Sequence, residues 1–91
     1  MNIFDDEDDF MVSSPKENYF SIAQTANQNI VQMEIEKVFR RLAVAEKMLD
    51  ERGLDDAYEA QIKALVIDED VNQRVDSIFI ELVGNIVTQC E

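Results

Sequence analysis

Apolar residues recur at helical spacing along most of the chain. Between residues 31 and 49 they step alternately by four and three, which is the spacing of a coiled-coil seam and predicts a helix with one apolar edge. The apolar faces of the predicted helices together exceed what a three-helix monomer of this size easily buries. We therefore expect the chain to self-associate, with a groove or helix offered to a partner protein as the alternative. The predicted self-association seam consists of Val31, Ile35, Val38, Phe39, Leu42, Ala45 and Leu49.

A second apolar face follows in a helix predicted over residues 70–90. Its apolar positions recur at i, i+3, i+4 and i+7, as they do in an amphipathic helix. Asp70 is the expected N-cap of this helix, with Gln73 three residues later. The predicted C-terminal apolar face consists of Val75, Ile78, Phe79, Leu82, Val83, Ile86 and Val87.

Start and stop signals predict where the other helices begin and end. Ser14, Pro15 and Glu17 form a helix start with a capping box, and Gly53 is placed as a C-terminal cap, so one long helix is expected over residues 15–52. The stretch 27–29 is a weak point, where Thr25 and Gln28 have the spacing of a second capping box, and a break or a continuous helix is equally possible. A short helix over residues 56–67, opened by Asp56, completes the set.

The expected fold is therefore all-α, with a long N-terminal helix packed against two shorter C-terminal helices as a helical hairpin or bundle. Two glycines and one proline supply too little turn chemistry for an all-β chain. We expect residues 1–13 to form a flexible acidic arm and residues 14–91 a single helical domain. The last two helices should fold back on the seam, while residues 15–30 project or pack on a neighbour.

Charge narrows the choice of partners. The chain carries 20 acidic and 8 basic residues, for a formal charge of −12. Direct nucleic-acid binding and attachment to an anionic membrane both need a surplus of basic residues, so neither is expected. No apolar run approaches a membrane span or a signal peptide, and the single cysteine, Cys90, cannot form an internal disulfide. We expect a cytoplasmic protein in which Cys90 is a small apolar residue of the last helix.

The candidate chemistry for catalysis is sparse. The chain has no histidine, no glycine-rich phosphate loop and no partner set that would activate a serine or Cys90. The acid run at residues 5–9 lacks the glycine and the later glutamate of a calcium loop. We therefore expect no catalytic residue, no metal site and no cofactor.

The acid run is interpreted instead as part of a docking arm. Aromatic side chains flank five consecutive carboxylates, which suits a protein partner with a basic rim and a hydrophobic pocket. A solvated, solubilising tail is the plain alternative. The predicted docking arm consists of Phe4, Asp5, Asp6, Glu7, Asp8, Asp9 and Phe10.

Two functions from different classes remain open. The first is a non-enzymatic assembly or adaptor protein that forms a homo-oligomer through its helices and docks on a larger machine with its acidic arm. The second is an acidic regulator of a nucleic-acid-binding protein, in which carboxylates imitate phosphates, although most of these acids also suit helix starts. The candidate mimic surface consists of Asp55, Asp56, Asp68, Glu69, Asp70, Asp76 and Glu81.

A third possibility, an oligomeric ring that handles DNA, depends on the few basic residues lying on one face. The bases in question are Lys37, Arg40, Arg41 and Lys47. Glu34, Glu36 and Glu46 are interspersed among them and are expected to dilute their charge.

Overall fold

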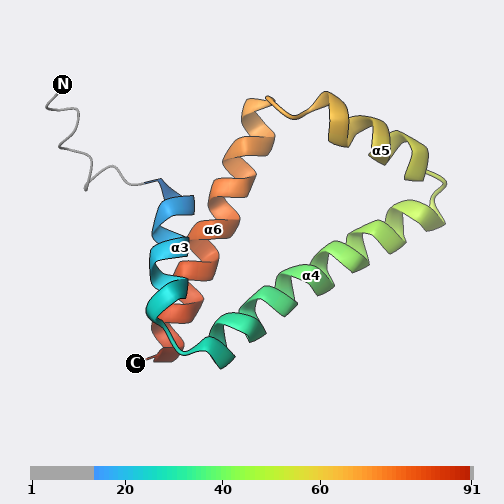
Figure 1. Cartoon of the computed structure of the whole chain (residues 1–91). Coiled ribbons are helices and arrows are strands. Elements are labelled where there is room, and N and C mark those ends of the chain that lie inside the picture. The colour runs from blue at the N-terminus through green and yellow to red at the C-terminus, as the bar shows by residue number, and fades with distance from the viewer. Residues whose placement is uncertain (1–13, 91) are drawn as a thin grey trace, which may run out of the picture.

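The computed structural model describes residues 14–90, and over this stretch the chain is helical with short connections (Figure 1). The all-α class expected from the sequence is confirmed. The docking arm, from Phe4 to Phe10, lies outside the described residues. In chain order the helices are α3 (Pro15–Thr25), α4 (Gln28–Glu51), α5 (Asp55–Ala64) and α6 (Glu69–Cys90).

Helix α3 begins at the predicted capping box. The hydroxyl of Ser14 accepts a hydrogen bond from the Glu17 amide at 3.1 Å, and the Glu17 carboxylate accepts one from the Ser14 amide. Pro15 occupies the start of the helix, where its missing N–H leaves no hydrogen bond unmade. The sequence signal for this start is therefore confirmed.

The expected single helix over residues 15–52 is in fact two helices. Helix α3 ends at Thr25, and Asn27 caps α4 by accepting hydrogen bonds from the amides of Asn29 at 2.9 Å and Ile30 at 3.3 Å. The second capping box does not form, because the Gln28 side chain instead donates to carbonyls of the preceding turn. The break lets α3 fold back along α6, so residues 15–25 pack within the chain rather than project.

The core lies where α3 and α4 meet the C-terminal half of α6. Tyr19, Val31, Leu82 and Ile86 are buried, and Ile86 has no exposed surface. The ring of Tyr19 lies 5.5 Å from that of Phe79, which places an aromatic contact between α3 and α6. Burying one such side chain contributes roughly 1.5–3 kcal/mol, so this small cluster is the main tertiary support of the fold.

The turn after α4 follows the predicted glycine signal. Gly53 has a φ of 69°, a conformation in which a residue with a Cβ is strained, and it ends the helix. The amide of Leu54 donates to the Leu49 carbonyl at 2.8 Å and closes the turn. Helix α5 starts at Asp55 with no side-chain cap at Leu54, so the expectation that Asp56 opens this helix is wrong by one residue.

The junction between α5 and α6 also differs from the expectation. Helix α5 ends at Ala64 and residues 65–67 form a turn. Asp68, rather than Asp70, caps the next helix, because its carboxylate accepts a hydrogen bond from the Val71 amide at 3.0 Å. Because residues 68–70 are all acidic, the sequence alone could not tell which of them caps the helix.

The described chain is a flat, open frame (Figure 1). Helices α4 and α6 meet near the C-terminus and diverge towards α5, which connects their far ends. The backbone of α5 approaches α4 but, within residues 14–90, not α6, so only α6 folds back on the seam as expected. The Cα atoms extend 49 × 35 × 15 Å, and the shortest of these dimensions holds no more than two packed helices.

Candidate interaction surface

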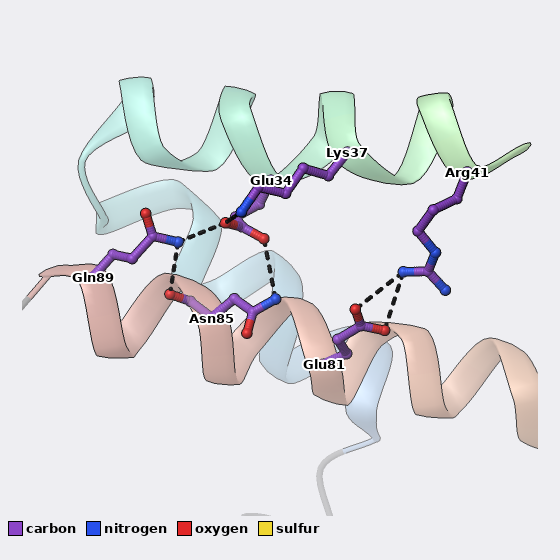
Figure 2. A network of polar contacts seen from close by, with 6 residues as sticks. All are labelled: Glu34, Lys37, Arg41, Glu81, Asn85 and Gln89. Carbon is purple, nitrogen blue, oxygen red and sulfur yellow. Dashed lines mark hydrogen bonds and ion pairs between the residues drawn. The ribbon is translucent and has the colours of Figure 1, made fainter. Parts of the chain in front are cut away.

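A buried carboxylate holds α4 across α6 (Figure 2). Glu34 is 1% exposed, and its Oε1 accepts a hydrogen bond from Asn85 Nδ2 at 3.1 Å. Its Oε2 accepts from Lys37 Nζ at 2.8 Å and from Gln89 Nε2. Three donors from two helices therefore satisfy one buried anion, which is the condition under which such burial is tolerated.

These donors lower the pKa of Glu34. The hydrogen bond from Lys37 is the largest cause, the amides of Gln89 and Asn85 add to it, and burial opposes them. Glu34 is therefore an ionised structural group, and it is not suited to donate a proton.

A second polar contact lies one to two turns further along α4. Arg41 Nη1 lies 3.1 Å from each carboxylate oxygen of Glu81, with both side chains about half exposed (Figure 2). An exposed pair of this kind contributes roughly 0.2–1 kcal/mol. Together with Glu34, it fixes the register in which α4 crosses α6.

Sequence reasoning missed the role of Glu34, which it treated only as a diluting charge. One signal was present: Glu34 lies three residues after Val31 and four before Val38, so it shares a helix face with the seam. A charged residue on that face needs partners, and Asn85 and Gln89 are spaced to provide them from one face of α6. The pairing itself required the tertiary arrangement.

The predicted seam is divided between the core and the open frame. Val31 is buried, and Ile35 and Val38 pack against the core cluster. Beyond the crossing with α6 the seam loses its cover, and Phe39 is 63% and Leu42 48% exposed. Ala45 is also exposed, whereas Leu49 is partly covered near the turn.

The C-terminal apolar face shows the same division. Leu82 and Ile86 are buried, while Ile78, Phe79 and Val83 pack around them. The ends of the face are open: Val75 and Val87 are both about two-fifths exposed. Cys90, expected on this face, is an exposed free thiol.

An apolar hollow lies where α5 turns into α6. It has a volume of about 440 Å³ and is open to solvent. Nearby apolar side chains are strongly exposed, Val66 by 67% and Ile67 by 87%. The sequence predicted that these residues belong to a helix that packs on the seam, whereas in the structure they are exposed to solvent. The hollow is lined by Tyr58, Gln61, Ile62, Leu65, Val66 and Val71.

A groove between α4 and α5 is lined by carboxylates and apolar side chains, with Lys47 as its one basic residue among residues 14–90. The Tyr58 hydroxyl donates to Glu46 at 2.9 Å, and this bond is the first cause that raises the pKa of Tyr58. Asp50, Asp55 and Glu59 add three more carboxylates to a groove of about 490 Å³. The groove is a concave surface with a negative lining.

The candidate mimic residues are spread over two helices and mostly serve the helices themselves. Asp55 and Asp56 lie in the first turn of α5, and Asp68 caps α6. Asp70 pairs with Arg74 at 3.1 Å. Carboxylates at helix starts stabilise the exposed amides there, so their number alone does not indicate a binding surface.

Two further features were sought in the described part of the chain. Among residues 14–90, no group of three or more cysteine and carboxylate side chains is arranged to hold a metal ion. Over the same residues, no helix combines the length and the apolar character needed to cross a membrane.

Comparison with known proteins places the chain in a family. No curated protein and no solved structure matches it. The matched region includes all four described helices, and with them the Glu34 contacts and the open frame. Over residues 10–91 the chain matches the family described as Domain of unknown function (DUF2018), and it belongs to that family.

Proposed function

We propose that the chain is a non-enzymatic assembly or adaptor protein that self-associates through its open helical faces. The observation that carries this proposal is the exposure of Phe39 and Leu42 in the middle of a regular apolar seam. The other helices of the frame also carry exposed apolar residues, among them Ile62 of α5 and Val75 of α6. Apolar surface of this extent on a small protein is typical of an interaction site.

The shape of the chain supports a second copy as the occupant. Within residues 14–90, a frame 15 Å thick has no further helix to lay over the seam. A stable protein interface buries roughly 800 Å² on each partner, and helix-to-helix packing of apolar seams supplies this in homo-oligomers. A copy of the same chain offers a matching seam, so a second copy alone is sufficient to cover this surface.

A pair of neighbouring substitutions tests the self-association. Leu42→Glu places a charge in the seam, whereas Ala43→Glu places the same charge on an exposed neighbouring position of α4 outside the seam. We expect Leu42→Glu to give a monomer and Ala43→Glu to keep the wild-type mass in light scattering after gel filtration. Equal masses for the two variants would exclude the seam as the interface.

The adaptor part of the proposal rests on the acidic arm. Five carboxylates between Phe4 and Phe10 are suited to a protein with a basic rim around an apolar pocket. Replacing the five acids by their amides should weaken capture of partner proteins from the native host while leaving helix content unchanged by circular dichroism. Undiminished capture would assign the arm to solubility alone.

A second candidate function is an acidic regulator of a nucleic-acid-binding protein. The groove between α4 and α5 favours it, since Glu46, Asp50 and Asp55 line a concave surface that suits basic side chains. Binding of this kind weakens steeply as salt rises, whereas apolar association holds or strengthens. Partner capture at 0.05 and 0.5 M salt therefore separates the two functions.

A further inference from the structure

Helix α4 carries a surface that neither function uses. Positions 37, 40, 41, 44, 47 and 48 are spaced by three and four residues, so they share one side of the helix next to the apolar seam. Of the acids interspersed among them, Glu34 is buried under α6, where its carboxylate pairs with Lys37 at 2.8 Å. We call this surface the basic stripe, and it consists of Lys37, Arg40, Arg41, Val44, Lys47 and Met48.

The basic stripe is exposed and combines charge with apolar surface. Val44 is 56% and Met48 47% exposed, and the side chains of Lys37 and Lys47 are more than half exposed. Lys37, Arg41 and Lys47 each contact one carboxylate, whereas Arg40 belongs to no ion pair within residues 14–90. Such a surface suits a segment that carries both carboxylates and large apolar side chains.

We propose that the acidic arm of the same chain lies on the basic stripe. The arm has five carboxylates at residues 5–9 and apolar side chains at both ends, from Phe4 and Phe10. Its charges oppose those of the stripe, and its aromatic rings match the exposed Val44 and Met48. Nucleic-acid phosphates share the charge of the arm, but the net charge of −12 repels them.

The arm is long enough and starts in the right place. Pro15 and Asn18 line a small hollow with Ile80 of α6, so the arm leaves α3 beside that residue. The next residue, Glu81, holds Arg41 of the basic stripe. The arm therefore has to cross one helix, about 10–12 Å wide, and its 13 residues extend to roughly 43 Å.

Paramagnetic broadening in the full chain tests this contact. A nitroxide is attached at Asn2→Cys in a Cys90→Ser background, and amide peak intensities are compared before and after the label is reduced. We expect at least a twofold loss at Arg40 and Val44, none at Lys63, and recovery in 0.5 M salt. Absent or evenly spread broadening would show a solvated tail and overturn the proposal.

Matched charge reversals test the partner residues. Arg40→Glu with Lys47→Glu should abolish the broadening, whereas Lys63→Glu with Arg74→Glu makes the same change in net charge elsewhere and should leave it. Circular dichroism checks that both pairs remain folded. Broadening that persists in the first pair would contradict the assignment to the basic stripe.

Two mixing experiments test the other possible occupants of the basic stripe. Isotopically labelled chains without nitroxide are mixed with unlabelled chains that carry it, and broadening in this mixture would assign the stripe to the arm of a second copy. Shifts of the Arg40 and Val44 amide peaks on adding duplex DNA at 0.15 M salt, in a chain that shows no broadening from the nitroxide, would assign it to nucleic acid. Either result overturns the contact within one chain, while the mass of the oligomer remains an independent readout of the proposed function.

Discussion

Glu34 of α4 accepts a hydrogen bond at 3.1 Å from Asn85 of α6, although 51 positions separate them in the chain. The contact joins α4 to α6, and Ile86, the residue after Asn85, is buried. The core continues past this contact to Val38 of α4 and Ile78 of α6, and the two helices then diverge and leave their apolar faces open. The buried anion therefore lies within the core, and the proposed interface begins beyond Val38.

Removing the Glu34 carboxylate should destabilise the fold. Glu34→Ala leaves the amides of Asn85 and Gln89 without their acceptor, at a cost of roughly 1–3 kcal/mol. Glu34→Gln keeps one acceptor and should cost less. Urea unfolding at one fixed chain concentration measures the free energy of unfolding of both variants. Equal losses of stability in the two would contradict the role given to the hydrogen bonds.

The lowered pKa of Glu34 predicts a pH dependence with a definite sign. The folded state holds the ionised form more strongly than the unfolded chain, whose pKa is near the ordinary 4.5. The contribution of Glu34 is therefore complete above that pH and is lost as pH falls through the lowered pKa. Urea midpoints between pH 3 and 6 should fall less steeply in Glu34→Gln than in wild type, and Glu36→Gln, at an exposed position of α4, serves as the control.

The two glycines should respond in opposite directions to alanine. Gly53→Ala forces a Cβ into a φ of 69°, which costs about 1 kcal/mol even though no atom crowds the position. Gly84 lies inside α6 with open space around its Cα, so Gly84→Ala should stabilise by roughly 0.5–1 kcal/mol. Thermal unfolding distinguishes them, and destabilisation by Gly84→Ala would show that α6 needs a small residue there.

The cap at Asn27 should control the break between α3 and α4. Asn27→Ala removes the acceptor for the amides of Asn29 and Ile30 and should cost about 1 kcal/mol. Asn27→Ser restores a cap and should recover most of this loss. Amide hydrogen exchange in the first turn of α4 checks the effect, and unchanged protection in Asn27→Ala would place the origin of the break elsewhere.

The sequence predicted the fold most accurately where the signal is local. The capping box at Ser14 and the glycine stop at Gly53 depend on neighbouring atoms, and both were found as expected. The cap expected at Asp70 was wrong because three consecutive acids compete for that role, and α5 begins one residue before Asp56 with no side-chain cap at all. At residues 27–29 local spacing allowed a continuous helix, and the packing of α3 on α6 accompanies the break.

The candidate site was predicted only in part because its division depends on tertiary geometry. Periodicity identified the seam, but it could not tell that Val31 enters the core while Leu42 stays open. Composition likewise treated Glu34 as one charge among many, although its partners in α6 make it a buried contact. A surplus of apolar surface was therefore predictable, and its location in the open frame was not.

The mass of the full wild-type chain in solution tests the central claim most directly. Sedimentation equilibrium over 1–100 μM should give a mass of at least two 10.5 kDa chains if a second copy covers the exposed seam residues Phe39 and Leu42, as proposed. A mass of one chain throughout this range would contradict the account of the frame as an interface between copies.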